Sequence, residues 1–187
     1  QQAAFRQIGM ESLLDSVGKN KIGVGEVALV ILDSGAEGTH EDLSGRFVWG
    51  TPSDLDPLGH GTAVTGIAAA ISDNARGITG ISRQADVITI AVNKVDSNGQ
   101  LYTDREEVFR AIASLRNLPY RLLVVNMSFS LYEKDEKEKK RWEDAFSALE
   151  DKALFVVAAG NYPGINTKDL VPCSTSHLSN VMCVGGV

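Results

Sequence analysis

Cysteine, histidine and proline are scarce in this chain of 187 residues, with two, three and five copies respectively. Cys173 and Cys183 form no Cys-x-x-Cys motif and have no histidine-rich surroundings, which argues against a zinc site. They either form one disulfide that closes a short loop or remain two buried thiols. The sequence leaves both alternatives open, since disulfide formation depends on the redox compartment.

Long apolar runs and basic clusters are also missing. The longest wholly apolar runs fall short of the roughly 20 residues that a membrane span needs, and the chain does not open with a signal-peptide pattern. The 18 Lys and Arg are scattered among 24 Asp and Glu, which gives a net charge of −6. The composition predicts one soluble globular domain without a nucleic-acid surface or a membrane span, and it leaves the localisation open.

Strand-like and helix-like segments alternate along the chain. Apolar runs rich in β-branched residues predict strands over residues 27–32, 85–92, 122–128, 154–159 and 181–187. Helical periodicity predicts helices over 10–17, from 60 to 70, after a capping box of Thr103 and Glu106, and within 133–152. Residues 40–59 are expected to form a loop. The alternation predicts a three-layer α/β/α fold with a mostly parallel central sheet.

Three polar residues stand where such a sheet places its ligands. Asp33 follows the first strand, Asn161 follows the fourth, and His60 lies between two glycines at the start of a helix. Taken alone, Asp33 in Asp-Ser-Gly is more often a turn former. Together, the carboxylate can orient a basic imidazole and the amide can donate to an oxyanion, so the three residues predict acyl transfer.

The motifs around these residues resemble those of the subtilisin-like serine peptidases, or subtilases. Residues 30–35 resemble the motif of the catalytic Asp, His60-Gly61-Thr62 that of the catalytic His, and residues 158–161 that of the oxyanion Asn. The order of Asp before His also agrees with this family. The resemblance implies a subtilisin-like fold, with Asp33 as the orienting carboxylate, His60 as the general base and Asn161 as the oxyanion donor. His40 and His177 lie in no such motif.

The resemblance also implies a substrate groove. Its pocket walls would be Ser128, Phe129 and Ser130 on one side and Ala158, Ala159 and Gly160 on the other. Subtilases commonly have Gly where Ser130 stands, so a narrowed pocket is expected. Asn98, Gly99 and Gln100 resemble the edge against which a substrate pairs as an added β-strand.

Acidic residues near the groove have two interpretations each. Asp54 and Asp56, just before His60, either attract basic substrate residues or lie in a solvated loop, which is the more common case. Asp42, Asp73 and Asn74 correspond to positions that often hold a structural calcium in this family, although the turn here carries one extra residue. Catalysis itself is expected to need no cofactor.

The nucleophile of the family has no counterpart in this sequence. Subtilases carry it several dozen residues beyond the oxyanion Asn, in a Gly-Thr-Ser turn, and the serines after Asn161 have no such context: Ser174, Ser176 and Ser179. Residues 1–187 are therefore expected to form the N-terminal two-thirds of a catalytic domain that is incomplete at its C-terminus. Such a chain would leave a sheet edge and a core face uncovered and would be inactive alone.

Two functions follow from this interpretation. The first is a serine endopeptidase that acts on peptides or proteins, with the Ser supplied by a segment missing from this chain, such as a C-terminal complementary fragment. The second is a catalytically inactive subtilase-like module that binds a peptide or a protein partner through the same groove. The joint presence of Asp33, His60 and Asn161 favours the peptidase, because binding alone has no chemical need for them.

Overall fold

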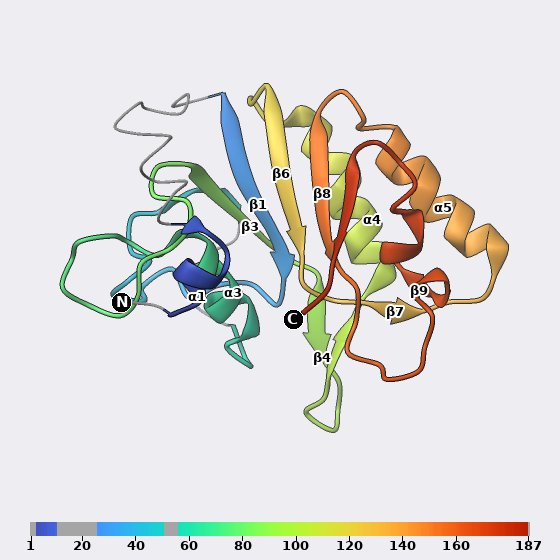
Figure 1. Ribbon diagram of the computed structural model, residues 1–187, viewed down its shortest axis with the longest axis horizontal. Helices are drawn as coiled ribbons and strands as arrows, with labels where there is room; N and C mark the ends of the chain where they lie inside the picture. Colours follow the sequence, from blue (N-terminus) through green and yellow to red (C-terminus); the bar gives the residue numbers. More distant parts are fainter. Residues whose placement is uncertain (1–2, 11–25, 51–55, 187) are drawn as a thin grey trace.

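The computed structural model describes residues 3–10, 26–50 and 56–186 and has a six-stranded parallel sheet at its centre. The strand order is β10-β8-β6-β1-β3-β2 (Figure 1). The strands are β1 (Val27–Asp33), β2 (Phe47–Gly50), β3 (Asp86–Ala91), β6 (Leu122–Met127), β8 (Ala153–Ala158) and β10 (Val181–Val184). Helices flank this sheet, as the alternating pattern of the sequence predicts.

Strand β1 lies in the middle of the sheet and pairs with β3 on one side and β6 on the other. Its side chains are almost all buried, in keeping with an apolar run that is covered on both faces. After β1 the chain builds β2 and β3 on one side, and after β3 it crosses to β6 on the other. Open α/β sheets bind ligands at the carboxyl ends of the strands where the direction of building reverses, and Asp33 ends β1 there.

Two helices, α4 (Arg105–Ser114) and α5 (Glu136–Ser147), cover one face of the sheet at β6 and β8 (Figure 1). Trp142 and Phe146 of α5 are fully buried, and Phe146 packs its ring 4.2 Å from that of Phe155 in β8. Val108 and Ile112 of α4 join the same core. These are the apolar positions at helical spacing, and they confirm the faces expected for both helices.

Helix α3 (His60–Ala69) contacts β1 and lies in the other half of the molecule, near α1 (Ala3–Gln7) (Figure 1). The remaining short helices are η1 (Leu115–Asn117), η2 (Thr167–Asp169) and η3 (Cys173–Thr175). The helix predicted over 10–17 falls almost wholly outside the described residues. No helix in the described part of the chain is long and apolar enough to cross a membrane.

Several local predictions were wrong. Residues 40–59 contain β2, the edge strand of the sheet, although they were expected to be a loop. The N-cap of α4 is Asp104, whose carboxylate accepts the N–H groups of Glu106 and Glu107, whereas Thr103 ends strand β5. A carboxylate caps as well as a hydroxyl and adds a favourable charge at the helix N-terminus, so the cap lies one residue later than predicted.

Two small antiparallel ribbons accompany the main sheet. Strands β4 (Asn93–Val95) and β5 (Leu101–Thr103) form a hairpin in the segment expected to be a polar connection. Strands β7 (Leu131–Tyr132) and β9 (Leu170–Val171) join the segment after β6 to the segment before η3. Both ribbons lie at the carboxyl edge of the sheet, where they flank the candidate site (Figure 1).

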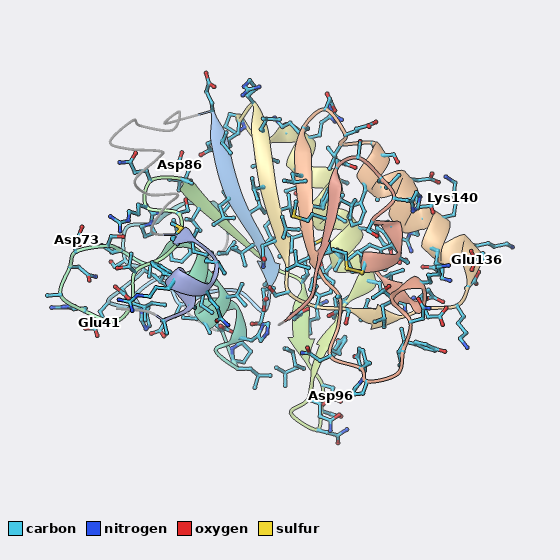
Figure 2. The ribbon with its side chains drawn as sticks, viewed as in Figure 1. Glu41, Asp73, Asp86, Asp96, Glu136 and Lys140 are labelled. Atoms are coloured by element: carbon cyan, nitrogen blue, oxygen red, sulfur yellow. A yellow bond between two sulfur atoms is a disulfide. The ribbon has the colours of Figure 1, made fainter. Side chains whose placement is uncertain are left out.

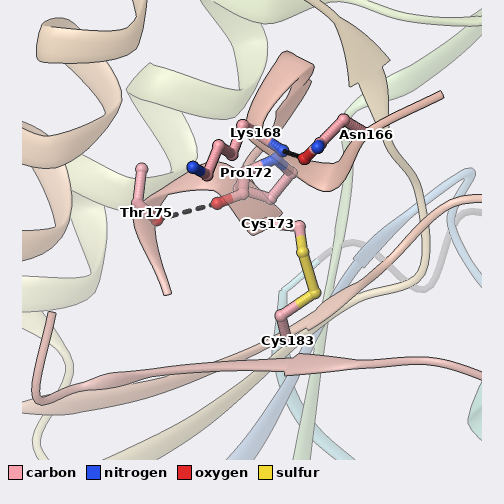
Figure 3. The surroundings of a disulfide bond; sticks show 6 residues. All are labelled: Asn166, Lys168, Pro172, Cys173, Thr175 and Cys183. Atoms are coloured by element: carbon pink, nitrogen blue, oxygen red, sulfur yellow. Dashed lines mark hydrogen bonds between the residues drawn. A yellow bond between two sulfur atoms is a disulfide. The ribbon is translucent and has the colours of Figure 1, made fainter. Parts of the chain in front are cut away.

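The two cysteines form a disulfide, which decides between the alternatives that the sequence left open. Cys173 in η3 is bonded to Cys183 in β10, with Cα atoms 5.1 Å apart (Figure 3). Beside it, the Thr175 hydroxyl donates to the carbonyl of Pro172 at 2.7 Å. The bond therefore fastens the turn that follows β9 to the edge strand of the sheet.

One face of the sheet is left uncovered at β8 and β10 among the described residues. The exposed fractions of Leu154, Met182 and Val184 are 37%, 54% and 48%. Alternate residues of a strand point to opposite faces, and Phe155 faces α5, so Leu154 points away from α4 and α5. An apolar surface of this kind is typical of a site that another segment or chain covers.

Candidate active site

The site centres on a hydrogen bond between Asp33 and His60. Nδ1 of His60 lies 2.6 Å from Oδ1 of Asp33. The carboxylate is 1% exposed, whereas the imidazole side chain is 45% exposed. Asp33 therefore holds the ring by Nδ1 from the buried side, an arrangement in which Nε2 can accept a proton.

Glycines bring the two elements that carry these side chains close together. Gly59 precedes α3 in the left-handed region, with φ of 68°. A Cβ on Gly61 would lie closer to the carbonyl oxygen of Gly35 than any real Cβ approaches such an atom. Only glycine fits there, so the first turn of α3 packs directly on the turn after β1.

Ser34 and Asp56 connect the same two elements, and neither was predicted to do so. The Ser34 hydroxyl donates to Oδ1 of Asp56 at 2.7 Å and accepts the N–H of Gly61 at 2.9 Å. Oδ2 of Asp56 accepts the N–H of Thr62 at 2.7 Å. Asp56 is thus a structural part of the site, which corrects the expectation of a solvated loop, and Asp54 lies outside the described residues.

The carboxylate of Asp56 is kept ionised by its hydrogen bonds. Burial raises the pKa of Asp56, but the hydrogen bonds from the Ser34 hydroxyl and the Thr62 N–H outweigh this effect and leave the pKa below its ordinary value. The negative charge also stands before the N-terminus of α3, where the helix dipole favours it.

Asn161 and the predicted pocket walls lie at the ends of β6 and β8, at the carboxyl edge of the sheet. Asn161 is exposed and comes after Gly160, which has φ of 87° at the end of β8. A Cβ on Gly160 would lie 2.8 Å from the hydroxyl oxygen of Ser130 and 2.9 Å from Cδ1 of Leu170. Ser130 and Gly160 thus face each other closely.

The other wall residues have structural contacts as well. The hydroxyl of Ser128 accepts the amide N–H of Asn126 at 2.9 Å, and Phe129 packs against the hydrophobic core. The N–H of Ala159 donates to the carbonyl of Val184 at 2.9 Å, while Ala158 ends β8. The walls are therefore rigid continuations of β6 and β8. Leu170 was not predicted to belong to this region because it is 9 or more residues from each motif.

The profile of the subtilase family matches residues 25–187, the part of the chain that builds the sheet and the site. This chain belongs to the subtilase family. It is 29% identical over 165 residues to the thermophilic serine proteinase of Bacillus sp. (strain AK1), covering 85% of this chain and 38% of that protein. It is 36% identical over 77 residues to thermitase of Thermoactinomyces vulgaris, covering 38% of this chain and 27% of that protein.

Solved structures of subtilases share the fold. The S41 psychrophilic protease superposes with a TM-score of 0.67 at 22% identity, covering 94% of this chain and 58% of that one. MycP1 from Mycobacterium smegmatis gives a TM-score of 0.64 at 18% identity, covering 98% and 56%. This subtilase chain therefore spans well under two thirds of the proteins that it matches.

The hairpin tip of this subtilase differs from the open edge that the resemblance implied. The N–H groups of Asn98 and Gln100 both donate to Oδ1 of Asp96 at 2.8 Å, and the N–H of Gly99 donates to the carbonyl of Asp96 at 3.0 Å. These three donors are occupied within the turn (Figure 2 labels Asp96 at the tip). Pairing with an added β-strand through them is not available in this conformation.

The candidate calcium ligands of this subtilase do not form a set that fits the ion. Oδ1 of Asp42 accepts the side-chain amide of Asn74 at 2.7 Å, and Oδ2 accepts the N–H of Ile78 at 2.8 Å. These hydrogen bonds lower the pKa of Asp42 more than burial raises it. Calcium needs oxygen ligands turned toward one point, whereas Asn74 presents its N–H groups to the carboxylate.

Asp73 completes the predicted calcium set but lies exposed in the turn at the margin of the molecule (Figure 2). The described residues hold no group of three or more His, Cys, Asp or Glu side chains that suits a metal ion. The hydrogen bonds of Asp42 stabilise its buried, ionised carboxylate and connect it to the turn. In this conformation the predicted residues do not present the ligand set that calcium requires.

We expect chelation to leave the stability of this domain unchanged. Free calcium at 100 times the Kd of a bound site would add about 2.7 kcal/mol to the free energy of unfolding. Its removal would lower Tm by about 5–10 °C. Thermal unfolding is measured by circular dichroism in 1 mM calcium chloride and in excess EGTA, for the wild type and for Asp42→Asn. A drop in Tm with EGTA in the wild type alone would contradict the expectation.

Proposed function

We propose that this chain supplies the orienting carboxylate, the general base and the oxyanion donor of a serine endopeptidase. The observation that carries the proposal is the 2.6 Å hydrogen bond between the buried carboxylate of Asp33 and the half-exposed ring of His60. A buried carboxylate fixes the tautomer of the ring and stabilises the imidazolium that forms on proton transfer. Membership of the subtilase family supports the same chemistry.

The proposed reaction proceeds in two halves. His60 Nε2 removes the proton of a serine hydroxyl as its oxygen attacks the scissile carbonyl, and the side-chain amide of Asn161 donates to the oxyanion that develops. His60 then gives the proton to the leaving amine, and the C–N bond breaks to leave an acyl-enzyme. Water repeats the sequence, with His60 as base and then acid, and releases the carboxylic acid. The bond-breaking steps require no metal or organic cofactor.

The nucleophile in this proposal comes from a segment outside these 187 residues. Among the described residues, no serine hydroxyl is hydrogen-bonded to His60. The hydroxyl of Ser179 is hydrogen-bonded to Glu150. Ser179 precedes β10 and Glu150 precedes β8, so both lie at the amino edge of the sheet. Ser174 and Ser176 lie in and beside η3, which the disulfide fastens to β10. The candidate base stands at the opposite, carboxyl edge.

The sheet also has an apolar surface that a serine-bearing segment would cover. The apolar face of β8 and β10, with Leu154, Met182 and Val184, would be buried by the part of a catalytic domain that bears the serine. This chain covers 38% of the thermophilic serine proteinase and 58% of the S41 psychrophilic protease. These shares support the interpretation of residues 1–187 as the N-terminal part of such a domain. The serine-bearing segment is then either a continuation of the chain or a complementary fragment.

The proposed substrate is a peptide or protein segment that binds along the strand ends that carry Ser130 and Gly160. Their close approach favours a small side chain before the scissile bond, because the Ser130 hydroxyl occupies space that a glycine would leave free. Asn98, Gly99 and Gln100 would contribute to binding only if the Asp96 turn opened, since their N–H groups are already bonded.

Intact-mass analysis with a fluorophosphonate probe tests the proposal. The purified protein is denatured and weighed before and after labelling of activated serines. We expect a serine-bearing polypeptide to take up one probe, with His60→Ala as the control that does not label. Absence of labelling in a preparation that holds the serine-bearing segment together with the 20.0 kDa chain would contradict the proposal and favour a peptide-binding module without catalysis.

A further inference from the structure

We infer that Asp56 is a positioning residue for His60, and that it acts by turning the proton of the Ser34 hydroxyl away from the carboxylate of Asp33. The inference deepens the proposed function, because it concerns the same base and the same orienting carboxylate. It follows from the placement of two carboxylates and one hydroxyl proton, each in the described part of the chain.

The Ser34 hydroxyl has one proton and two carboxylates within reach. Its oxygen lies 2.7 Å from Oδ1 of Asp56 and 3.3 Å from Oδ1 of Asp33. The shorter contact is the stronger hydrogen bond, so the proton points to Asp56. Ser34 is 3% exposed, and its oxygen also accepts the N–H of Gly61, so the side chain has no solvent to turn to.

Asp33 is sensitive to this choice because it has few donors. Its Oδ1 accepts the N–H of Ser34 at 2.7 Å and the His60 ring at 2.6 Å, and its Oδ2 is buried without a hydrogen-bond partner. A third donor from the Ser34 hydroxyl would stabilise the carboxylate and weaken its attraction for a protonated His60. Because Asp56 accepts the Ser34 proton, this competing donor does not bond to Asp33. The charge of Asp33 therefore remains available to the imidazole.

Asp56 also fixes the helix turn that carries His60. Gly59, the N-cap of α3, has no side chain to accept the first N–H groups of the helix. Ser34 accepts the N–H of Gly61 and Asp56 accepts that of Thr62, so two residues outside the helix replace the cap. The carboxylate of Asp56 thus fixes both the direction of the Ser34 hydroxyl proton and the position of the imidazole.

Other charged groups near Asp56 could act on His60 by their field alone. Those that face this end of α3 among the described residues are Asp33 from β1 and, around the hollow beside the helix, Glu37, His40 and Asp42. A test must therefore separate the loss of a charge from the redirection of a proton. The Ser34 hydroxyl makes that separation possible, because only the second effect passes through it.

The test is a double-mutant cycle of Asp56→Asn and Ser34→Ala, read by NMR titration of the histidine rings in this chain. The three histidines give three sets of signals, and exposed His177 is the internal reference. Asp96→Asn is the matched control, since Asp96, like Asp56, accepts two hydrogen bonds, here from two backbone N–H groups, but lies at the hairpin tip. The readout requires no hydrolysis, so it is independent of whether the proposed peptidase activity is found.

We expect Asp56→Asn to lower the titration midpoint of His60 by about half to one pH unit, the worth of one hydrogen bond to the carboxylate. Ser34→Ala alone should leave the midpoint in place, and in its background Asp56→Asn should lose its effect. Asp96→Asn should change nothing.

Three results would overturn the inference. One is an equal shift from Asp56→Asn with and without the Ser34 hydroxyl, which would indicate a pure charge effect. Another is a rise of the midpoint in Ser34→Ala, which would mean that the hydroxyl already donates to Asp33. The third is loss of the folded state in Asp56→Asn while Ser34→Ala remains folded, which would make Asp56 a determinant of the fold rather than of the imidazole.

Discussion

Replacement of His60 by Ala is expected to lower kcat/KM for peptide hydrolysis by about 10⁴-fold or more in a preparation that includes the serine-bearing segment. Among the described residues, the ring is the base that Asp33 contacts, and in the proposed mechanism the serine proton has no acceptor without it. Initial rates on a chromogenic peptide, corrected for the fraction of serine that labels in the wild type, give the ratio.

His177→Ala is the matched control for this loss. His177 is an exposed histidine, 58% accessible at the side chain, whose Nε2 lies 3.5 Å from Glu143 on α5. Its removal should leave kcat/KM unchanged. Full activity of His60→Ala, with His177→Ala also active, would exclude His60 as the base and with it the proposed mechanism.

Gly61→Ala is expected to have the largest effect on the free energy of unfolding, a loss of at least about 3 kcal/mol. The added Cβ would overlap the carbonyl oxygen of Gly35, and backbone on both sides leaves nothing flexible to move aside. Helix α3 would have to shift away from β1, which carries His60 away from Asp33. Urea unfolding, followed by tryptophan fluorescence, measures the loss.

Gly66→Ala, one and a half turns further along α3, is the control on the same helix. A Cβ there would meet only the Cδ1 atom of Ile78, at an ordinary 3.8 Å. Because alanine favours a helix over glycine by about 1 kcal/mol, this variant should be as stable as the wild type or more so. Equal destabilisation by the two substitutions would show that the close approach of Gly61 to Gly35 is not what limits the site.

The strands could be predicted from the sequence because each depends on neighbouring residues, whereas the pair of Asp33 and His60, 27 residues apart, was predicted from the resemblance of their two motifs to those of the subtilases. A run of β-branched residues needs only burial to become a central strand, and His60 is placed by the glycines beside it. Edge strand β2 was missed because it has only four residues, 47–50, between stretches of sequence rich in Gly, Pro and Asp. Its aromatic and β-branched residues, Phe47, Val48 and Trp49, were the available signal.

The role of Asp56 could not be predicted, because its partner Ser34 is 22 residues away in the sequence. A carboxylate before a helix has many local acceptors to choose from, and only the packing of α3 on the turn after β1 brings these two side chains together. For the same reason, the sequence could not predict the occupied N–H groups of the hairpin or the hydrogen bonds of Asp42. In each, a side chain satisfies backbone donors that the sequence alone would leave open to a ligand.

Strand β1 is the first strand of the described sheet to leave the ribosome, yet it lies in the centre. Its neighbours are β3, which ends at Ala91, and β6, which ends at Met127, 94 residues after Asp33. At roughly 5–20 residues per second, synthesis takes roughly 5–20 seconds to complete the second of these neighbours, and until then the apolar strand lacks a partner on at least one side. The strand that carries Asp33 is therefore an apolar segment that stays open to aggregation while the chain is being made.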